Sequence, residues 1–571
     1  MRRDPGWIFG FYAKTKIPEH KSAEIEKLLP QHSIKSINPN FCIYFNQSKN
    51  TFYNINSQWL INGIGVCDSG SKYKLMDQSD WENFFISPGS IELSGHFIKI
   101  SWDYSAIRIS NDRIGLKTIY YLEAKDEIYF STNLGILLRF LHNPEIDLSV
   151  FGSKWLLFNP LNYNSFIKGI KKLQPNSELY IGENGLKITT KEYGFLTDSY
   201  PVEKFFDELN KLINIQIPEN YQISFGLSGG LDSRLLLALF YKSKREINLH
   251  SFGFEYENDV KIASALAYKL NIEHKVLKSD LNDQVIIDLM PEYISQNELI
   301  EPASTFLRLY KLNDVYFENK IILDGANGEI YRRQFLNRLY YAGIKPVMDK
   351  NVGRIFSALR FNRADIFKDD VYNILADGAK EDILECLDKM PDVKSVGLEN
   401  YLDLLNIRTR FANYFGPEQM RLDSFIISVM PYINDNLLKN VFGLSLKEKN
   451  NSRLYIGYLR KIGAPFSSIP LVKGDTTYPF GLSKIQSAVY TRLKGRLLSN
   501  HQKSPVVEFY NHTENHVKEL LLDNSTLACS YYDSGKIQKI VQDFYSGDKN
   551  NAVKLDWLFS FELFRRNLLL N

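Results

Sequence analysis

Residues 228–233, with the sequence SGGLDS, form the part of this chain whose residue types and spacing most clearly suggest chemistry. They stand between an apolar run at 221–227 and a leucine-rich helical pattern, which predicts a strand, a tight turn and a helix start. In that order, backbone N–H groups and the positive end of a helix meet where a phosphate could bind. The glycines would let a ligand approach the backbone, the serines would add hydroxyl groups, and the aspartate would offer Mg²⁺ a carboxylate. The residues predicted to contact a nucleotide here are Ser228, Gly229, Gly230, Leu231, Asp232 and Ser233.

The bulk composition is that of an ordinary globular protein. A length of 571 residues predicts roughly two to four domains, and 44% apolar with 24% charged residues is typical of such proteins. A net charge of +3 gives no general basic field, so we expect no nucleic-acid partner. Apolar runs are too short to cross a membrane, and no secretory signal is visible after MRRDPGW, so we expect a cytoplasmic protein without a membrane partner.

The cysteines, histidines and short basic clusters suggest no additional site. The cysteines lack C-x-x-C spacing and are predicted to be reduced and mostly buried. His512 and His516 share a helix face, but no third zinc ligand can be named. The basic clusters at 242–245 and 332–333 are interpreted as solvated surface. The cysteines are Cys42, Cys67, Cys386 and Cys529.

The order of expected elements divides the chain into two kinds of structure. The first 190 or so residues are β-rich, with helical patterns near 22–29 and 135–141. A helix is predicted at 202–213, and from 221 onward strands and helices alternate, which implies a parallel sheet with helices on both faces. The predicted elements of that part are strands at 251–256, 274–277 and 320–329, the last ending in a glycine-rich turn, and a helix at 260–270. Beyond 350 the pattern is mainly helical. The turns at the carboxyl edge of the sheet, where ligands bind, would be 228–233, 252–254 and 324–329.

Two segments carry a family resemblance. The SGGLDS loop resembles the SGGxDS loop of the N-type ATP pyrophosphatases. Asp112-Arg113-x-Gly115, a Tyr-Tyr strand and Phe130-Ser131-Thr132, followed by residues 165–181, resemble the class II glutamine amidotransferase domain. In this order they resemble the asparagine synthetase-like family, which includes asparagine synthetases, β-lactam synthetases and the macrolactam synthetases (cyclases) of lasso peptides. The resemblance implies an α/β protein: an Ntn-type αββα sandwich at 1–195 and a doubly wound parallel-sheet ATP-pyrophosphatase domain at 202–571, with a mainly helical C-terminal part.

One departure from the family concerns the amidotransferase domain. A working glutaminase of that class needs a cysteine directly after the initiator methionine, but position 2 is Arg2 and the first cysteine is Cys42, inside a strand pattern. We therefore expect the first domain to be a scaffold that cannot make ammonia from glutamine. The β-lactam synthetases and lasso cyclases share that loss, because their substrate supplies the amine.

The resemblance also implies roles for residues outside the SGGLDS loop. Asp232 and Glu329 would bind Mg²⁺, with Glu329 standing where the family carries an aspartate. Ala326 stands where the family carries a glutamate or a catalytic tyrosine, so no acid–base group is expected there. Lys473 would stabilise negative charge, with Arg460 and Lys461 as the fallback. The further nucleotide-contacting residues would be Phe252, Gly253 and Phe254 near adenine, and Asp324 and Gly325 in the following turn. Weak candidates are Asp259, explained most simply as an N-terminal helix charge, and Arg421 and Asp423, which could reach the cleft from the helix before Met430-Pro431.

The implied activity is that of an AMP-forming carbon–nitrogen ligase that uses ATP and Mg²⁺. A carboxylate would be adenylated and joined to an amine supplied by the substrate, with the macrolactam ring of a lasso-type peptide as the leading expectation. Such a cyclase would work beside a leader peptidase and a leader-recognition protein. An amide synthetase using ammonia or a small-molecule amine, and a non-catalytic scaffold, remain open. The sequence identifies neither substrate, nor the general base, nor the oligomeric state.

Overall fold

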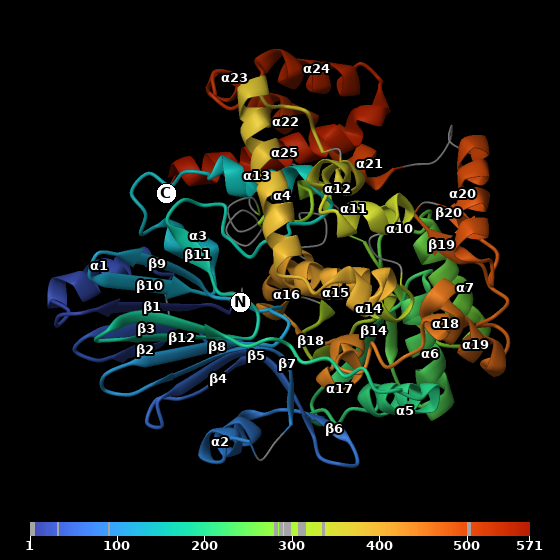
Figure 1. The fold of residues 1–571 in the computed structure, drawn as a ribbon, viewed down its shortest axis with the longest axis horizontal. Coiled ribbons are helices and arrows are strands. Elements are labelled where there is room, and N and C mark those ends of the chain that lie inside the picture. The colour runs from blue at the N-terminus through green and yellow to red at the C-terminus, as the bar shows by residue number, and fades with distance from the viewer. Residues whose placement is uncertain are drawn as a thin grey trace.

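The computed structural model describes residues 6–30, 34–89, 92–278, 284, 289, 298–305, 316–333, 337–361, 363–474, 476–498 and 504–570. Two antiparallel sheets are built from the first 190 residues, and a parallel sheet surrounded by helices follows (Figure 1). Within these ranges, no helix combines the length and the apolarity required to cross a lipid bilayer. The α/β class expected from the sequence is confirmed.

The first antiparallel sheet has six strands and pairs distant segments of the N-terminal part. Its spatial order is β11 (Ile170–Lys172), β9 (Tyr120–Ala124), β10 (Glu127–Ser131), β1 (Ile8–Ala13), β3 (Phe41–Phe45) and β2 (Ile34–Ile37). Cys42 lies in β3 opposite Phe11 and Ile37 and is fully buried. Helices α1 (Glu19–Leu28) and α3 (Leu134–Leu138) cover the outer face of this sheet.

The second antiparallel sheet packs face to face against the first. Its order is β13 (Gly185–Thr190), β12 (Ser177–Gly182), β8 (Ile107–Asn111), β7 (Leu93–Trp102), β5 (Trp59–Asp68) and β4 (Thr51–Asn54), with β6 (Tyr73–Leu75) paired to β5. Ile8, Phe41, Ile98 and Ile109 belong to the buried cluster between the sheets. Trp81 of α2 (Gln78–Ile86) packs with Trp59 and Ile61 on the outer face. Helix, sheet, sheet and helix thus form the expected αββα sandwich.

The third sheet is parallel and five-stranded, and its strand order marks a binding edge. The order is β16 (His274–Leu277), β15 (Asn248–Phe252), β14 (Gln222–Gly226), β17 (Lys320–Leu323) and β18 (Ile427–Val429). The chain moves outward from β14 through β15 to β16 and then returns to the other side of β14 as β17. Ligands of open parallel sheets bind beyond the carboxyl ends of the strands at such a reversal.

Two elements have bounds that differ from the expectation, and one strand was not predicted. The strand predicted at 251–256 runs over Asn248–Phe252 because Gly253 has φ of 128° and Glu257 Oε1 accepts the N–H of Phe254 at 2.7 Å, which turns the chain. The helix predicted at 260–270 begins two residues earlier, as α7 (Asn258–Leu270). Strand β18 was not predicted, because its three residues are too short for a period to be seen.

The linker into the second part and its helices largely follow the expectation. Helix α5 (Val202–Ile213) has the predicted bounds, and the linker before it pairs with the C-terminal part, since Tyr200 N–H donates to the Gly443 carbonyl at 2.9 Å. The helices that follow are α6 (Leu231–Ser243), α10 (Asn337–Ala342), α11 (Ile344–Met348), α12 (Val352–Leu359), α13 (Asp369–Asp388), α14 (Val393–Val396), α15 (Leu398–Arg410), α16 (Gly416–Asp423), α17 (Asp435–Leu438), α18 (Leu446–Lys449), α19 (Arg453–Ile462), α20 (Lys484–Leu498), α21 (Pro505–His512), α22 (Glu514–Leu521), α23 (Asn524–Leu527), α24 (Ser534–Tyr545) and α25 (Ala552–Leu570).

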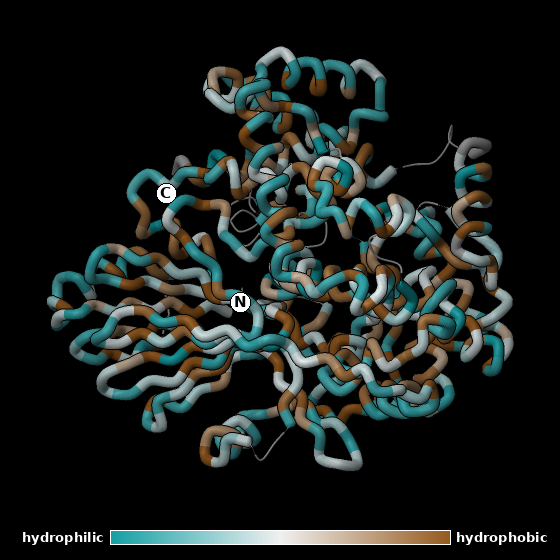
Figure 2. The backbone as a smooth tube through the Cα atoms, in the orientation of Figure 1, coloured by the Kyte–Doolittle hydropathy of each residue, from teal (hydrophilic) through white to brown (hydrophobic). Residues whose placement is uncertain are grey.

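The N-terminal and C-terminal parts share packing. Helix α4 (Leu148–Leu156) crosses α13 at backbone contact distance: a Cβ on Gly152 would lie 2.0 Å from the Leu375 carbonyl oxygen, and one on Gly378 would lie 2.1 Å from that of Ser149. Hydrophobic residues follow the inner strands and helices, while the peripheral helix α24 mixes hydrophilic and hydrophobic residues, and its hydrophobic residues are buried (Figure 2). A side chain at Gly152 or Gly378 would force α4 and α13 apart.

Candidate active site

The SGGLDS segment lies where the sequence predicted it, between β14 and α6 at the strand-order reversal. Its polar groups are bonded to one another: Ser228 N–H donates to Ser233 Oγ at 3.1 Å, the two serine hydroxyls lie 2.9 Å apart, and Gly230 N–H donates to Ser228 Oγ at 3.2 Å. The N–H groups of Ser228 and Gly230 are therefore engaged within the protein. The first turn of α6 supplies the N–H groups that have no intrahelical partner.

Asp259 does more than place a charge at a helix start. Its Oδ1 accepts the N–H of Gly229 at 2.8 Å, which ties the first turn of α7 to the loop. Because β15 lies between these two elements in the sequence, the bond fixes the loop from the neighbouring βα unit. Asp259 thus positions the SGGLDS backbone.

The turn at 324–329 packs directly against the start of α6. A Cβ on Gly325 would lie 3.2 Å from Ser233 Cα, and one on Gly328 would lie 2.5 Å from Asp232 Oδ1. Asp324 folds back on its own turn, since its Oδ1 accepts the Ala326 N–H at 3.0 Å, and burial raises its pKa. The structure therefore brings Asp232 and the Asp324–Glu329 turn together, as the sequence predicted.

Arg332 occupies the position beside Asp232, and the interpretation of 332–333 as solvated surface is wrong. Arg332 Nε lies 2.7 Å from Asp232 Oδ1 and its Nη2 contacts Oδ2, a bidentate pair with both side chains less than a fifth exposed. Arg333 is also engaged: Nε lies 3.0 Å from Asp403 Oδ2. Two adjacent arginines in a turn have the sequence pattern of an exposed surface. Their acidic partners lie 100 and 70 residues away in the sequence, so no local pattern shows that the arginines are paired.

Asp232 and Glu329 provide an acidic pair that fits a cation. Burial raises the pKa of Glu329, the charge of Asp232 raises it further, and Arg332 opposes both effects. Two carboxylates that repel each other in a buried site favour a positive partner, and in the structure this partner is Arg332. In the described part of the chain no three His, Cys, Asp or Glu side chains group as a metal site. Two carboxylates nevertheless suit Mg²⁺, which usually takes one or two from a protein and the rest from phosphate and water.

Two buried tyrosines set the distance between the loop and the turn. Tyr432 Oη donates to the Asp232 carbonyl at 3.0 Å, and Tyr455 Oη donates to the Gly328 carbonyl at 2.9 Å. Their rings stack with centroids 5.9 Å apart. Tyr432 belongs to the predicted Met430-Pro431 turn after β18, so that turn supports the site from behind.

Lys473 lies beside the loop on a short hairpin, β19 (Leu471–Lys473) and β20 (Thr476–Tyr478). Val472 N–H donates to the Gly229 carbonyl at 3.1 Å, so the hairpin is joined to the SGGLDS backbone. The Lys473 side chain reaches solvent, and the loss of some of its hydration to neighbouring protein atoms lowers its pKa. Asp475, next to it in the sequence, lies outside the described residues.

Arg234 of α6 anchors the segment that leads into this hairpin. It is fully buried, and its guanidinium donates to the carbonyls of Ile469 at 2.7 Å and Pro470 at 2.6 Å. The two alternatives to Lys473 as the charge-stabilising residue lie outside the hairpin. Lys461 lines a groove between α5 and α19, and Arg460 approaches Gly481. Of the three basic candidates, Lys473 is therefore the one on the element bonded to the loop.

The residues predicted for adenine contact lie at the same sheet edge, one strand away. Phe252 ends β15 with 36% of its surface exposed, and Ser251 Oγ donates to the Leu227 carbonyl just before the SGGLDS loop. Phe254 stacks on Tyr256 with centroids 5.2 Å apart. This edge offers exposed aromatic surface and a positive-φ glycine, Gly253, next to the loop.

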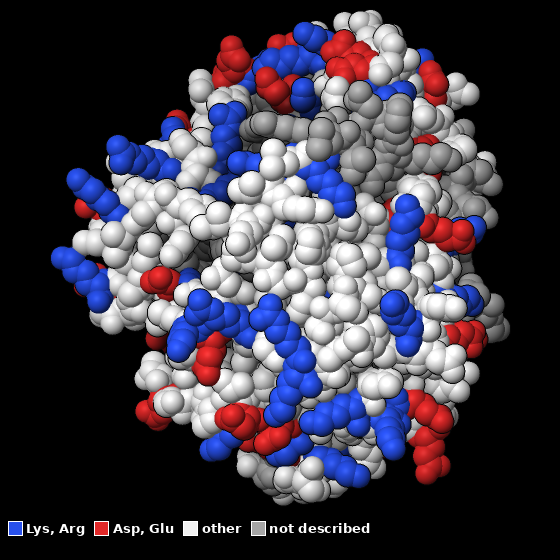
Figure 3. All heavy atoms as spheres, turned by 90° about the vertical axis from the view of Figure 1, so that its right-hand side faces the viewer, with Lys and Arg blue, Asp and Glu red and all other residues white. Residues whose placement is uncertain are grey.

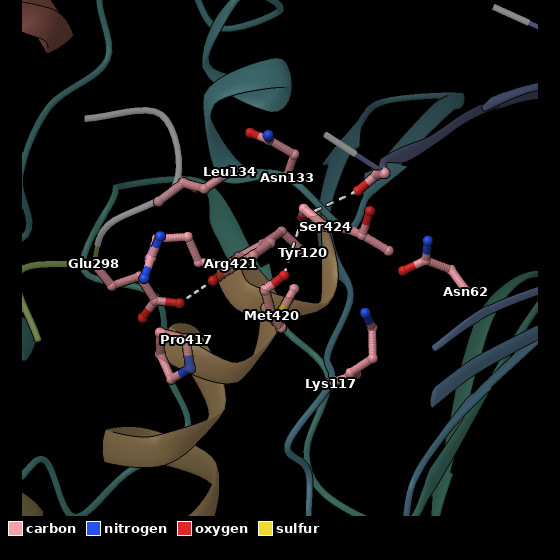
Figure 4. Close-up of a pocket in the computed structure, with 12 residues that line it drawn as sticks. Asn62, Lys117, Tyr120, Asn133, Leu134, Glu298, Pro417, Met420, Arg421 and Ser424 are labelled. Atoms are coloured by element: carbon pink, nitrogen blue, oxygen red, sulfur yellow. Dashed lines mark hydrogen bonds between the residues drawn. The ribbon is translucent and has the colours of Figure 1, made fainter. Parts of the chain in front are cut away.

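Asp423 and Arg421 do not face the SGGLDS loop. Asp423 is buried against the N-terminal part, where Oδ1 lies 3.1 Å from His96 Nε2 and Oδ2 lies 3.3 Å from Lys117 Nζ. Arg421 pairs with Glu418 at 2.7 Å and lines a cavity of about 40 Å³ between α16 and the N-terminal sheets (Figure 4). In Figure 4, Tyr120 donates to Glu298 in this cavity. The suggestion that these residues reach the cleft is wrong for Asp423, which holds the two parts together.

Three of the four cysteine thiols lie in surroundings that keep them protonated and unreactive. Burial raises the pKa of both Cys42 and Cys386 to about 12 and also raises that of Cys67.

In the 242–245 cluster, Arg245 donates to the carbonyls of Ile213 and Ile215 at 2.6 and 2.7 Å, so it is a structural anchor and not solvated surface. No sequence signal could have found this role of Arg245, because the carbonyls that it binds lie 32 and 30 residues earlier in the chain.

Comparison with known proteins points to the same segment. Residues 205–312 match the family model of asparagine synthase. A relative from Bacillus subtilis (strain 168), "Asparagine synthetase [glutamine-hydrolyzing] 1", is 26% identical over 228 residues, which are 37% of this chain and 35% of that protein. The match thus spans about a third of the length of that relative.

Two solved structures also align over part of the chain. One is glutamine phosphoribosylpyrophosphate amidotransferase from B. subtilis with ADP and GMP, with a TM-score of 0.20, 10% identity, and coverage of 59% of this chain and 79% of that one. The other is the allosteric regulatory enzyme of purine biosynthesis, with a TM-score of 0.21, 11% identity, and coverage of 60% and 72%. At these TM-scores the likeness carries no weight for fold or function. The segment that matches asparagine synthase contains the SGGLDS loop with β14, β15 and β16, and together with the distant relative it supports an asparagine synthetase-like family for this protein.

Proposed function

We propose that the protein is an ATP- and Mg²⁺-dependent ligase that adenylates a substrate carboxylate and joins it to an amine. The observation that carries this proposal is the SGGLDS loop at the strand-order reversal, with Asp232 packed against the turn that bears Glu329. The matched asparagine synthase segment and the distant relative support the amide-forming direction. The same edge carries Phe252–Phe254 for adenine and Lys473 for negative charge.

The chemistry has two steps. A carboxylate oxygen of the substrate attacks the α-phosphorus of ATP, the bond to the bridging oxygen breaks, and pyrophosphate leaves with the electron pair. An amine nitrogen then attacks the acyl carbon, loses a proton, and AMP leaves with the electrons of the acyl C–O bond. That proton passes to a base other than residue 326, because an alanine has no titratable group.

The protein's residues would act by positioning and charge. The first turn of α6 would donate N–H groups to phosphate oxygens, and Asp259 and Arg234 would keep the loop and the hairpin in place. A Mg²⁺ held by Asp232 and Glu329 would supply neutralisation of the pyrophosphate charge. Lys473 would offset the charge that develops in either step.

At a finer level, we propose that the amine comes from the substrate itself and that the product is the macrolactam ring of a lasso-type peptide. The thiol of Cys42 is fully buried in β3, and burial raises its pKa to about 12, which does not suit a nucleophile. The proposal retains a glutaminase-like scaffold at 1–195, a synthetase part at 202–571, a cytoplasmic location, and a leader peptidase and a leader-recognition protein as partners.

ATP–pyrophosphate exchange with Mg²⁺ tests the function directly. Wild type, Asp232→Ala and the control Asp207→Ala, which changes an exposed acid on α5, are compared with aspartate, glutamate, and a peptide with a free N-terminus and an internal Asp or Glu. We expect exchange that needs the peptide, is absent in Asp232→Ala and persists in Asp207→Ala. Exchange with a free amino acid would replace the cyclase with a small-molecule synthetase. Absence of both exchange and ATP binding would refute the ligase and favour a scaffold.

A further inference from the structure

Helix α20 (Lys484–Leu498) presents an apolar stripe to solvent. Ile485, Val489 and Leu493 are 68%, 53% and 57% exposed, and Tyr490 beside them is 39% exposed. Their spacing of four residues places the aliphatic side chains one above another on a single helix face. A stripe of this kind usually faces a protein core, whereas here it stands among the most exposed large hydrophobic residues of the described chain.

The charged residues nearest the stripe in the sequence have one sign. No Asp or Glu occurs between Asp475 and Glu508, whereas Arg492 and Lys494 lie on α20 itself. Arg492 is exposed next to Leu493. Figure 3 views this side of the molecule: its middle is mainly uncharged, and the charged groups that border the middle are mostly Lys and Arg. The surface therefore complements a segment that is both apolar and acidic.

The helix is connected to the candidate active site through the hairpin. Lys494 Nζ donates to Thr477 Oγ1 at 2.7 Å and to the Thr477 carbonyl at 3.2 Å, which fixes α20 to β20. Thr476 of β20 pairs with Lys473 of β19, and Val472 N–H donates to Gly229 of the loop. A segment bound on α20 would therefore lie on an element joined by hydrogen bonds to the SGGLDS backbone.

We propose that the exposed face of α20 is the docking surface for an apolar, acidic segment of the peptide substrate. The inference rests on the proposed function and deepens it, because it names the part of the protein that recognises a peptide as distinct from the part that activates its carboxylate. A membrane surface fits less well. Helices that lie in a bilayer interface bury one whole face in it, whereas α20 is held by Lys494 against a hairpin of the catalytic part and its stripe lacks Trp and Phe.

The test measures binding separately from catalysis. The probe is a fluorescein-labelled amphipathic peptide of leucine and glutamate, and its comparison is the same peptide with lysine for glutamate. The variant is Ile485→Ser/Leu493→Ser, and the matched control is Ile374→Ser/Leu384→Ser on α13, whose side chains are 47% and 43% exposed. Fluorescence anisotropy gives the affinity, and thermal unfolding confirms that each variant is folded.

We expect the acidic peptide to bind wild type and the α13 control alike, and the α20 variant to bind about tenfold or more weakly, since two aliphatic contacts are lost. The lysine peptide is expected to bind less well than the acidic one, and added salt is expected to weaken binding of the acidic peptide. Equal binding to all variants, or no binding to wild type, would overturn the docking surface.

Two further measurements separate the possible failures. Sedimentation with vesicles of phosphatidylcholine and phosphatidylglycerol tests the membrane directly, and α20-dependent binding to vesicles without peptide binding would overturn the proposal. Mg·ATP binding is measured on the same samples. Loss of peptide binding with ATP binding intact in wild type would reject only the docking surface, whereas absent ATP binding would reject the proposed function.

Discussion

Arg332 holds Asp232 through both carboxylate oxygens, across 100 residues of sequence. The backbone of Asp232 is held as well, because its carbonyl accepts from Tyr432 Oη at 3.0 Å. The guanidinium supplies the positive charge that the acidic pair Asp232 and Glu329 requires. A Mg²⁺ that binds this pair must compete with Arg332, since bidentate arginine–carboxylate pairs are strong and geometrically specific.

Removal of that guanidinium is expected to ease cation binding. In Arg332→Met we expect the Mg²⁺ concentration for half-maximal ATP binding to fall by roughly tenfold, a change of about 1.4 kcal/mol. The matched control is Arg333→Met, which removes the neighbouring pair with Asp403 and leaves Asp232 untouched. Titration calorimetry of ATP binding at a series of Mg²⁺ concentrations gives the comparison. An unchanged or raised Mg²⁺ requirement in Arg332→Met would show that Arg332 does not compete with the cation.

The two loop glycines are expected to differ in their tolerance of a methyl group. A Cβ on Gly229 would lie 2.3 Å from Val472 Cγ2, whereas the nearest atom to one on Gly230 would be Ser228 Oγ at 3.3 Å. Gly229→Ala should therefore push the hairpin off the loop and destabilise the protein by roughly 1–3 kcal/mol, while Gly230→Ala should unfold nearly as wild type does. Urea unfolding measures both, and Val472→Ala should restore part of the loss in Gly229→Ala. Equal stability of the two alanine variants would contradict the clash.

Lys473 is expected to contribute to rate more than to ATP binding. In Lys473→Met we expect the exchange rate to fall by about 10²–10³, as for the loss of a preorganised charge, with little change in the ATP dissociation constant. Lys461→Met on α19 is the control, because that lysine lines the groove between α5 and α19. A larger loss in Lys461→Met than in Lys473→Met would move the catalytic charge to the fallback position.

Asp423 is expected to make stability depend on acid pH. Burial raises its pKa, but His96 and Lys117 more than offset this, so its pKa lies below the ordinary value. A carboxyl group with a depressed folded-state pKa contributes stability that is present above its unfolded pKa of about 3.9 and is lost as pH falls through the folded pKa. At neutral pH, Asp423→Asn should cost about 3–5 kcal/mol, because Lys117 stays buried without its counter-charge.

Urea unfolding at a series of pH values checks the sign of this effect. The difference in unfolding free energy between wild type and Asp423→Asn should be largest above about pH 5 and shrink as pH falls below the unfolded pKa. The control is Asp126→Asn, whose pair with Lys14 is about half exposed and should contribute about 0–1 kcal/mol. A difference that stays constant down to acid pH would mean that Asp423 is not ionised in the folded protein.

The sequence by itself determined the helices, strands and turns that depend on the pattern of neighbouring residues. The apolar run, the paired glycines and the leucine-rich pattern placed β14, the SGGLDS loop and α6, and amphipathic spacing placed α5 over the observed residues, Val202–Ile213. Strand–helix alternation fixed the parallel sheet and therefore the edge that gathers the loop, the Phe252–Phe254 turn and the Asp324–Glu329 turn. These features follow from hydrogen bonding and side-chain direction over a few neighbouring residues.

Tertiary structure alone decided which side chains meet at that edge and which do not. Arg332 reaches Asp232, Asp259 holds Gly229, and Arg234 anchors the strip before Lys473, whereas Asp423 turns to the N-terminal sheets. Each partner lies tens to hundreds of residues away, so no local pattern records the pair. The choice is made when the elements pack, because a buried charge must find a counter-charge or a carbonyl within reach, and the packed fold determines which one is there.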